Sequence, residues 1–331
     1  MSVLYAATGN SRLEYEDRCI VVYRDGKRFS RFPSLKLDKI VVFGNVDIST
    51  QVINHCLQEG IDIVFLSNNG RYFGRLQGPE TKNPDVRRIQ YQISSDESKC
   101  LEFAKIFITA KIHNCRVVLQ RHREEEESFD KTIKLLGRLK EKAQRAKSLP
   151  ELRGIEGIAS KEYFSHFNYM TPKEFVFPGR KRRPPTDPIN SLLSFGYTLL
   201  VYDMFSAVAE VGLDPYLGIL HEDKYGRPSI ALDLIEEYRP IIVDLLVLMV
   251  LNKKVLQPQD FYTSDEGAVL LTDEGRKKFL EQYEKRMLTE TSYKMQSRLE
   301  KTTYRRTILR QAYSLVRAFK GEDVYRPMML K

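Results

Sequence analysis

The strongest sign of chemistry in this sequence is an acid-rich segment at residues 220–240, which reads LHEDKYGRPSIALDLIEEYRP. One imidazole, His221, precedes a predicted helix with Ser229 as its N-cap, because a serine side chain accepts hydrogen bonds from the first helical N–H groups. Three acids follow on this helix, at Asp233, Glu236 and Glu237. Spacings of three and four residues place them on neighbouring helix surface, where like charges repel. A cation is therefore expected among them.

Two kinds of cation can fill this role. One is a divalent metal ion held by the carboxylates and the imidazole. The other is a basic side chain of the same segment, Lys224 or Arg239. The segment by itself leaves both interpretations open.

A further acid, Glu156, lies among small residues in the segment 153–160, RGIEGIAS. Small neighbours such as Gly154 and Gly157 let another backbone or a substrate approach closely. In isolation, Glu156 is either a functional acid or an ordinary surface acid. The aromatic residues that follow, among them Tyr163, are expected in the core rather than as residues that stack on bases.

Four consecutive cations lie between prolines in the segment 177–190, FPGRKRRPPTDPIN. These cations are Arg180, Lys181, Arg182 and Arg183. The prolines disfavour a helix, so a loop with its charges in solvent is predicted. Such a loop either keeps the protein soluble or binds phosphate, and the net charge of the whole chain favours phosphate binding.

The composition is that of a basic protein with enough apolar residues for a sizeable core. Its 331 residues include 53 Lys and Arg against 44 Asp and Glu, a net charge of +9. This excess favours a polyanionic partner, with nucleic acid ahead of an anionic membrane surface. The four cysteines show neither C-x-x-C nor zinc spacing, so ordinary buried thiols in a reducing compartment are expected.

No membrane segment or signal peptide is expected. The start of the chain lacks a basic stretch followed by an apolar core. The longest apolar run, residues 241–251, is interrupted by Asp244 and is shorter than the roughly 20 residues of a membrane span. A cytoplasmic location in a prokaryotic cell is therefore predicted, the cell type following from the family resemblance described below.

The fold class predicted is α+β and multidomain, with a β-rich N-terminal domain followed by a larger all-α domain, which the family resemblance described below implies to be the catalytic domain. Short β-branched runs recur up to residue 77, at 2–6, 19–23, 40–43, 61–66 and 72–76. Asp25-Gly26 and Asn69-Gly70 supply hairpin turns between pairs of these runs. We expect a β-rich dimerisation domain at 1–77, a linker at 78–85 and an α-helical catalytic domain at 86–331, helical almost to its end.

The last part of the chain is strongly basic, with nine cations and three acids after Ser297. Arg298, Lys301 and Arg305 have helical spacing. A helix with a solvated basic face is predicted, one that can also follow a phosphate backbone.

Several segments together resemble the CRISPR-associated protein one family. They are VVFGNV at 41–46, GRYFGRL at 70–76, GIEG at 154–157 followed by Tyr163-Phe164, RPPTDPINSLLSFGY at 183–197, and LH at 220–221 with DLIEEYRP at 233–240. Each is weak alone, but all of them in this order are specific, and the resemblance covers essentially the whole chain.

The resemblance implies a metal-dependent DNA endonuclease and integrase of CRISPR spacer acquisition. It assigns Glu156, His221 and Glu236 as catalytic metal ligands, with Asp233 as an auxiliary acid. It also implies homodimers formed through the β domains, which hold the small second CRISPR-associated adaptation protein. The DNA would be double-stranded or branched, namely the spacer precursor and the CRISPR repeat.

The ligand set that the resemblance implies suits Mn²⁺ or Mg²⁺, since it combines carboxylates with an imidazole and contains no cysteine. Lys224 and Arg227 are predicted to contact phosphates next to this site, and the basic loop at 180–183 to hold the backbone further out. Two alternatives differ in class. One is a non-catalytic nucleic-acid scaffold, and the other is a stand-alone nuclease of branched DNA or RNA.

Overall fold

The structure is a computed structural model that describes residues 2–7, 9–78, 83–123, 127–181, 184–295 and 298–331. The chain divides into two compact units. The first consists of Met1–Glu80 together with Leu271–Glu284, and the second of Thr81–Leu270 together with Lys285–Lys331. The division assigns Leu271–Glu284 to the strand-rich unit, whereas the sequence analysis places this segment in the helical domain.

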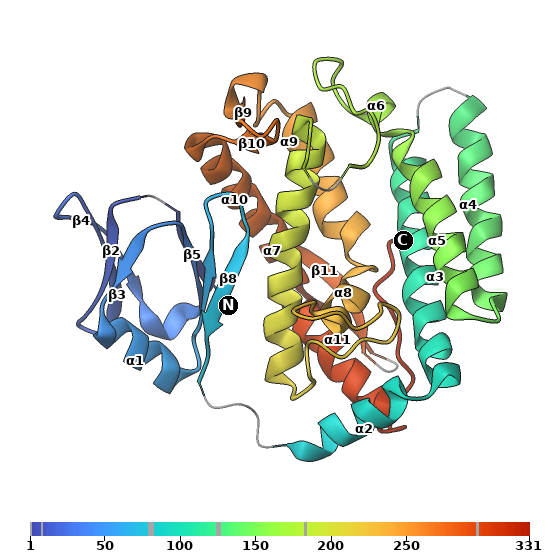
Figure 1. Cartoon of the computed structure of the whole chain (residues 1–331), viewed down its shortest axis with the longest axis horizontal. Coiled ribbons are helices and arrows are strands. Elements are labelled where there is room, and N and C mark those ends of the chain that lie inside the picture. Colours follow the sequence, from blue (N-terminus) through green and yellow to red (C-terminus); the bar gives the residue numbers. More distant parts are fainter. Residues whose placement is uncertain (1, 8, 79–82, 124–126, 182–183, 296–297) are drawn as a thin grey trace. The chain divides into compact units, whose positions relative to one another are not determined.

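In the first unit, the described residues form two four-stranded sheets, ordered β1-β5-β7-β8 and β4-β3-β2-β6. The core lies between them and includes Leu4, Leu13 and Ile40 (Figure 1). The elements are β1 (Ser2–Ala6), β2 (Ser11–Glu16), β3 (Cys19–Arg24), β4 (Lys27–Pro33), a 3₁₀ turn (Ser34–Lys36), β5 (Leu37–Phe43), β6 (Val46–Ile48), α1 (Thr50–Glu59), β7 (Asp62–Leu66) and β8 (Tyr72–Leu76).

Local sequence accounts for the turns of this unit. Asp25 and Gly26 both have positive φ, as the tight hairpin between β3 and β4 requires. Ser49 caps α1 by accepting a hydrogen bond from the Val52 N–H, and Gly60 ends the helix in the left-handed conformation. The sequence analysis did not predict strands β2, β4 and β6.

Arg276, on α10 (Asp273–Leu288), explains why Leu271–Glu284 belongs to the first unit. Its side chain is almost fully buried, and its guanidinium donates to the carbonyl oxygens of Ala7 and Asn68, at 3.2 Å each. It also lies over the ring of Phe43. This charged side chain satisfies backbone acceptors that the strand ends leave open.

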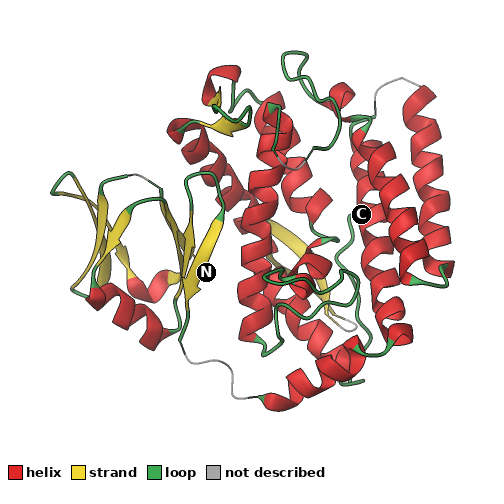
Figure 2. Ribbon diagram, in the orientation of Figure 1, coloured by secondary structure: helices red, strands yellow, loops and turns green. Residues whose placement is uncertain are grey.

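Helices dominate the second unit (Figure 2). Its helices are α2 (Pro84–Ser94), α3 (Glu97–Arg121), α4 (Glu127–Arg145), α5 (Leu149–Phe164), α6 (Phe167–Met170), α7 (Pro188–Glu210), α8 (Ser229–Ile235), a π-helical turn (Arg239–Asp244), α9 (Leu245–Asn252), a 3₁₀ turn (Pro258–Asp260) and α11 (Tyr304–Phe319). Helix α3 packs against α4 and α5, and α7 packs against α8 and α11. The predicted fold class, a β-rich N-terminal part followed by a mainly helical part, is confirmed.

Helix α7 is long and apolar enough to cross a membrane by length and composition. However, 72% of its apolar window is buried inside the protein, as in the core helix of a soluble domain. The helix is apolar on nearly all sides because other helices surround it.

The prediction of continuous helix after residue 260 is wrong. Short strands β9 (Phe261–Thr263) and β10 (Val269–Leu271) pair with each other, and β11 (Glu290–Met295) pairs with β12 (Arg298–Thr303). Arg298 and Lys301 therefore lie on a strand, and helix α11 begins only at Tyr304. The threonines and the buried Tyr293 favour a strand, and this preference outweighs the helical spacing of the cations.

Candidate functional site

The predicted site residues all lie in the second unit, on three different elements. Glu156 lies in the middle of α5, His221 in the loop between α7 and α8, and Glu236 at the C-terminal end of α8. Helix α8 starts one residue earlier than predicted: Pro228 precedes it, and Ser229 is its first residue instead of its N-cap. The loop before α8 folds back along this helix, so that His221 contacts Asp233 and lies near Glu236.

Asp233 holds the loop that carries His221. Its Oδ2 accepts the N–H groups of Ile219 and Leu220, at 2.6 and 3.0 Å. Its Oδ1 accepts the His221 N–H at 3.0 Å and contacts His221 Nδ1 at 2.6 Å. Because a carboxylate only accepts, Nδ1 is the donor in this contact, so in the neutral form of the ring the lone pair is on Nε2. Asp233 is thus engaged by four donors and orients the imidazole.

The lone pair of His221 faces Glu236. His221 Nε2 is 4.0 Å from Glu236 Oε1, and Arg239 Nη2 is 3.2 Å from the same oxygen. Burial by itself raises the pKa of Glu236, but the charges of Arg239 and Lys111 outweigh it and hold the pKa at about 2. Glu236 is therefore a buried carboxylate that stays ionised.

Lys111 of α3 lies between the two glutamates. Its ammonium donates a hydrogen bond to Glu156 Oε1 and lies 2.7 Å from Glu236 Oε2. Ser160 Oγ also donates to Glu156 Oε1, at 2.7 Å. Burial alone raises the pKa of Glu156, whereas the Lys111 charge lowers it, and the net direction is downward. Lys111 is thus one cation that the crowded acids require.

Arg153 joins the helix of Glu156 to the loop of His221. Lying one turn before Glu156 on α5, it donates to the Leu220 carbonyl from Nε and Nη2, at 3.1 and 2.8 Å, and to Glu222 at 2.7 Å. Gly218 allows the loop to fold back, because a Cβ there would lie 2.7 Å from the His221 carbonyl oxygen. These contacts fix His221 relative to α5.

Glu237 points away from this cluster. It is fully buried, and its Oε1 accepts from Gln311 Nε2 at 2.7 Å and from the Tyr325 hydroxyl at 3.1 Å. Burial raises its pKa to about 8. A structural role for Glu237 agrees with these contacts.

The donor set fits a divalent cation. The Nε2 lone pair and the ionised Glu236 face each other at 4.0 Å, a separation that two ligands of one ion can have, since each lies about 2.0–2.2 Å from it. Among the described residues, Glu236 Oε2 is buried and receives no hydrogen bond of good geometry. The hydrogen bond from His221 Nδ1 to Asp233 is typical of metal-binding histidines. However, no three His, Cys, Asp or Glu side chains of the described chain converge as a ready-formed coordination shell.

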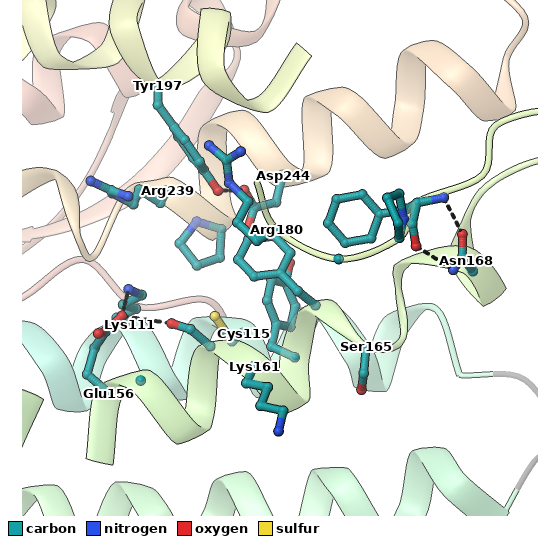
Figure 3. Close-up of a pocket in the computed structure, with 18 residues that line it drawn as sticks. Lys111, Cys115, Glu156, Lys161, Ser165, Asn168, Arg180, Tyr197, Arg239 and Asp244 are labelled. Carbon is teal, nitrogen blue, oxygen red and sulfur yellow. Dashed lines mark hydrogen bonds and ion pairs between the residues drawn. The ribbon is translucent and has the colours of Figure 1, made fainter. Parts of the chain in front are cut away.

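Two cavities open beside the cluster and share Arg180, Tyr197 and Arg239. One, of about 580 Å³, is also lined by Lys111, Glu156 and Asp244. Lys111 and Glu156 lie together on one side of it, and Arg180, Tyr197 and Asp244 on another (Figure 3). The other, of about 880 Å³, is lined by His221, Lys224, Tyr225 and Arg227. The walls of both cavities thus carry cations and aromatic rings.

Asn190 fixes the start of the basic loop. This buried residue accepts from Arg180 Nη1 at 2.7 Å and from the Lys181 N–H at 2.9 Å, and it donates to Asp187 and to the Gly179 carbonyl. Arg180 therefore lines the cavities, while the side chain of Lys181 is exposed. The predicted phosphate contacts at Arg182 and Arg183 lie outside the described residues.

Sequence reasoning missed two members of the cluster, Lys111 and Arg153. Lys111 lies between Ala110 and Ile112, which are apolar and buried. A lysine between apolar residues on a long core helix was the signal available. Arg153 carried no such signal, because its partners in the loop, the Leu220 carbonyl and Glu222, lie 67 and 69 residues further along the chain.

The fold and site define a class of protein: a strand-rich unit joined to a helical unit that holds a Glu–His–Glu cluster beside cationic cavities. The model of the family "CRISPR associated protein Cas1" matches residues 4–285. The chain therefore belongs to the Cas1 family.

Individual relatives agree with this assignment. "CRISPR-associated endonuclease Cas1 1" of Chlorobaculum tepidum is 36% identical over 339 residues, covering 99% of this chain and 98% of the relative. A solved Cas1 protein of Thermotoga maritima has a TM-score of 0.83 and 27% identity, covering 99% of this chain and 100% of that one. A chain of a Cas6-RT-Cas1–Cas2 complex has a TM-score of 0.84 at 24% identity; the match covers 100% of this chain and 36% of that one and shows the fold alone.

Proposed function

We propose that this protein is a divalent-metal-dependent DNA endonuclease and integrase of CRISPR spacer acquisition, with Glu156, His221 and Glu236 holding Mn²⁺ or Mg²⁺. One observation carries the proposal. In a Cas1-family chain, His221 Nε2 faces an ionised, buried Glu236 at 4.0 Å beside cavities lined by cations. The Chlorobaculum relative is named an endonuclease, which supports nuclease activity here.

The bound ion would supply Lewis-acid chemistry at the scissile phosphate. The side chains of the chain supply binding and orientation. Asp233 keeps the proton on His221 Nδ1 and so fixes the ring. Arg180, Lys224 and Arg227 bind phosphates of the backbone without reading bases. The attacking oxygen belongs to the 3′-hydroxyl of the incoming DNA in integration and to water in hydrolysis, so one site serves both reactions.

The partners proposed are those of the family. DNA, double-stranded or branched, would bind as spacer precursor and as CRISPR repeat. The protein would form homodimers and bind the small second adaptation protein. The net charge of +9 supports a polyanionic substrate.

An integration assay tests the proposal. Purified protein, with the small second protein, is incubated with short duplex DNA and a supercoiled plasmid carrying a CRISPR repeat, in Mn²⁺ or in EDTA. Glu156→Ala and His221→Ala should reduce strand transfer at least about 10³-fold while the dimer stays folded. Glu162→Ala is the control, because Glu162 lies on the same helix α5 outside the cluster, and it should retain activity.

Each alternative predicts a different outcome. Undiminished Mn²⁺-dependent strand transfer in Glu156→Ala or His221→Ala would remove these residues from the site. A scaffold would bind DNA equally in EDTA and Mn²⁺ and would join or cut no ends. A stand-alone nuclease would cut branched DNA or RNA but neither co-purify with the second protein nor integrate.

A further inference from the structure

Lys111 is a cation that lies between two of the proposed ligands of this site. Its side chain is 10% exposed, and its ammonium contacts one oxygen of each proposed ligand glutamate. Figure 3 shows the contact with Glu156 at the edge of the smaller cavity. The lysine comes from α3, an element that provides none of the three proposed ligands.

The charges around Lys111 keep it protonated. Its ammonium lies against two carboxylates, whose negative charges favour the charged form over the neutral amine. A permanent positive charge therefore lies at the two carboxylates that a divalent ion would also need.

The two contacts differ in kind. The ammonium donates a hydrogen bond to Glu156, whereas the contact with Glu236 Oε2 is an ion pair without a well-directed hydrogen bond. Glu236 also keeps its contact with Arg239 through the other oxygen. An ion that replaced the ammonium at Glu236 would thus break few directional bonds.

We propose that Lys111 is a resident cation that competes with the divalent ion for Glu156 and Glu236, so that loading the ion displaces the ammonium from these carboxylates. The inference rests on the function proposed above, which takes the two glutamates as ligands. Lys111 is then a positioning residue. It holds the glutamates together when no ion is bound, and it sets how tightly the ion binds.

The displaced ammonium has a place to go. Lys111 lines the cavity of about 580 Å³, whose wall also carries the buried carboxyl group of Asp244. A turn of the lysine side chain about its terminal bonds would therefore move the ammonium from the glutamates into this cavity without moving α3.

Calorimetric titration with Mn²⁺ and thermal unfolding test this proposal, both on the full chain without DNA. Lys111→Met keeps the length of the side chain and removes its charge. In EDTA its Tm should fall below that of the wild type, because the glutamates lose a cation. Its Kd for Mn²⁺ should be at least about tenfold lower than wild type, and Mn²⁺ should raise its Tm further, since tighter binding to the folded state stabilises it more.

Two control variants make the result specific. Lys105→Met removes a lysine from the same helix α3 outside the cluster and should change neither quantity. Lys111→Arg keeps the cation and should bind Mn²⁺ no more tightly than wild type. If Lys111→Met is unfolded in EDTA, circular dichroism during Mn²⁺ titration replaces the unfolding measurement: refolding at low Mn²⁺ supports the proposal, and failure to refold at any concentration overturns it.

The outcomes separate this proposal from the proposed function. If wild type binds Mn²⁺ and Lys111→Met binds it equally or more weakly, competition is wrong while the metal site stands. If neither binds Mn²⁺, both fall. If Lys111→Met binds Mn²⁺ more tightly than wild type and the double variant Lys111→Met/Glu236→Gln loses this gain, the ion binds at Glu236, the carboxylate for which the lysine competes.

Discussion

Two adjacent glutamates at the end of α8 differ in their charge. Glu236 and Glu237 are both buried, and both follow the last turn of α8. The pKa of Glu236 is lowered to about 2, while burial raises the pKa of Glu237 to about 8. At neutral pH the first is ionised and the second carries a proton.

The difference comes from their partners. Lys111 and Arg239 lie within 3.2 Å of Glu236, whereas Glu237 meets the neutral groups of Gln311 and Tyr325. Burial disfavours charge at both positions, so the nearby cations decide which carboxyl group ionises. The ionised side faces cavities. The neutral side binds the C-terminal segment, where Asn114 bridges the Glu237 and Met328 carbonyls. One side borders cavities, and the other is packed against the C-terminal segment.

Exchanging each glutamate for glutamine is the strongest test of this difference. Glu236→Gln removes the charge from the site, so strand transfer or DNA cleavage in Mn²⁺ should fall about 10³-fold or more. Glu237→Gln keeps a neutral side chain of the same size and should retain activity within about threefold. Equal losses in the two variants would contradict the division. Circular dichroism checks that both are folded.

The pH dependence of stability sharpens the same comparison. The folded state holds the Glu237 proton up to about pH 8, whereas the unfolded chain releases it near 4.5, so wild type loses stability as pH rises through this window. Glu236 acts oppositely. Its contribution to the unfolding free energy is present above about pH 4.5 and is lost as the pH falls toward 2. Relative to wild type, Glu237→Gln should gain on the order of 3 kcal/mol in unfolding free energy between pH 5 and 9.

Urea unfolding in EDTA at several pH values measures this gain. The contribution of Asp244, whose pKa burial raises to about 6, is common to both proteins and cancels in the difference. Parallel pH profiles for wild type and Glu237→Gln would show that Glu237 is ionised in the folded protein.

The sequence was most informative where local rules decide the structure. The Asp25-Gly26 turn and the strand at Ser2–Ala6 follow from turn chemistry and β-branched patterning. The hairpin of β11 and β12 was not predicted, because the helical spacing of the cations in this segment indicated a helix instead of strands. Tertiary partners decide such segments, and spacing alone does not reveal them.

For the site, the sequence predicted which residues gather but not what joins them. Glu156, His221 and Glu236 belong to one cluster, and Glu237 faces away from it. The contacts that assemble the cluster come from distant elements: Lys111 lies on α3, and Arg153 reaches a backbone carbonyl in the loop of His221. A single sequence does not reveal such pairs, since the partners are far apart along the chain.

A smaller effect is expected when Asp233, which holds the loop of His221 in place, is changed to asparagine. Asp233→Asn cannot accept from all four donors, so the His221 ring loses its fixed orientation. Mn²⁺ affinity and activity should fall about 10- to 100-fold, well short of the loss in Glu236→Gln. Calorimetry and the integration assay measure the two quantities.

The control for this prediction is Asp223→Asn. Asp223 lies in the same loop and accepts only the Gly218 N–H, at 2.9 Å, among the hydrogen bonds of the described residues. It should change both quantities less than about threefold. A similar loss in both variants would mean that loop stability in general, rather than orientation of the imidazole, controls the site.

The smallest predicted effect compares two exposed tyrosines, one on each side. Tyr225 lies on the rim of the larger cavity between Lys224 and Arg227, fully exposed, while Tyr313 lies on α11, the helix that provides Gln311, and is 45% exposed. Neither ring contributes much to the core, so Tyr225→Ala and Tyr313→Ala should leave Tm unchanged.

Stacking of an aromatic ring on a base is worth about 1–3 kcal/mol. For a fully exposed ring the lower value applies, so Tyr225→Ala should weaken DNA binding about fivefold and Tyr313→Ala not at all. Fluorescence of 2-aminopurine in the bound DNA distinguishes stacking from charge, because only loss of a stacked ring brightens the probe. Equal DNA affinities for the two variants would mean that the DNA lies away from this rim. The larger cavity would then not be part of the ionised side that binds DNA.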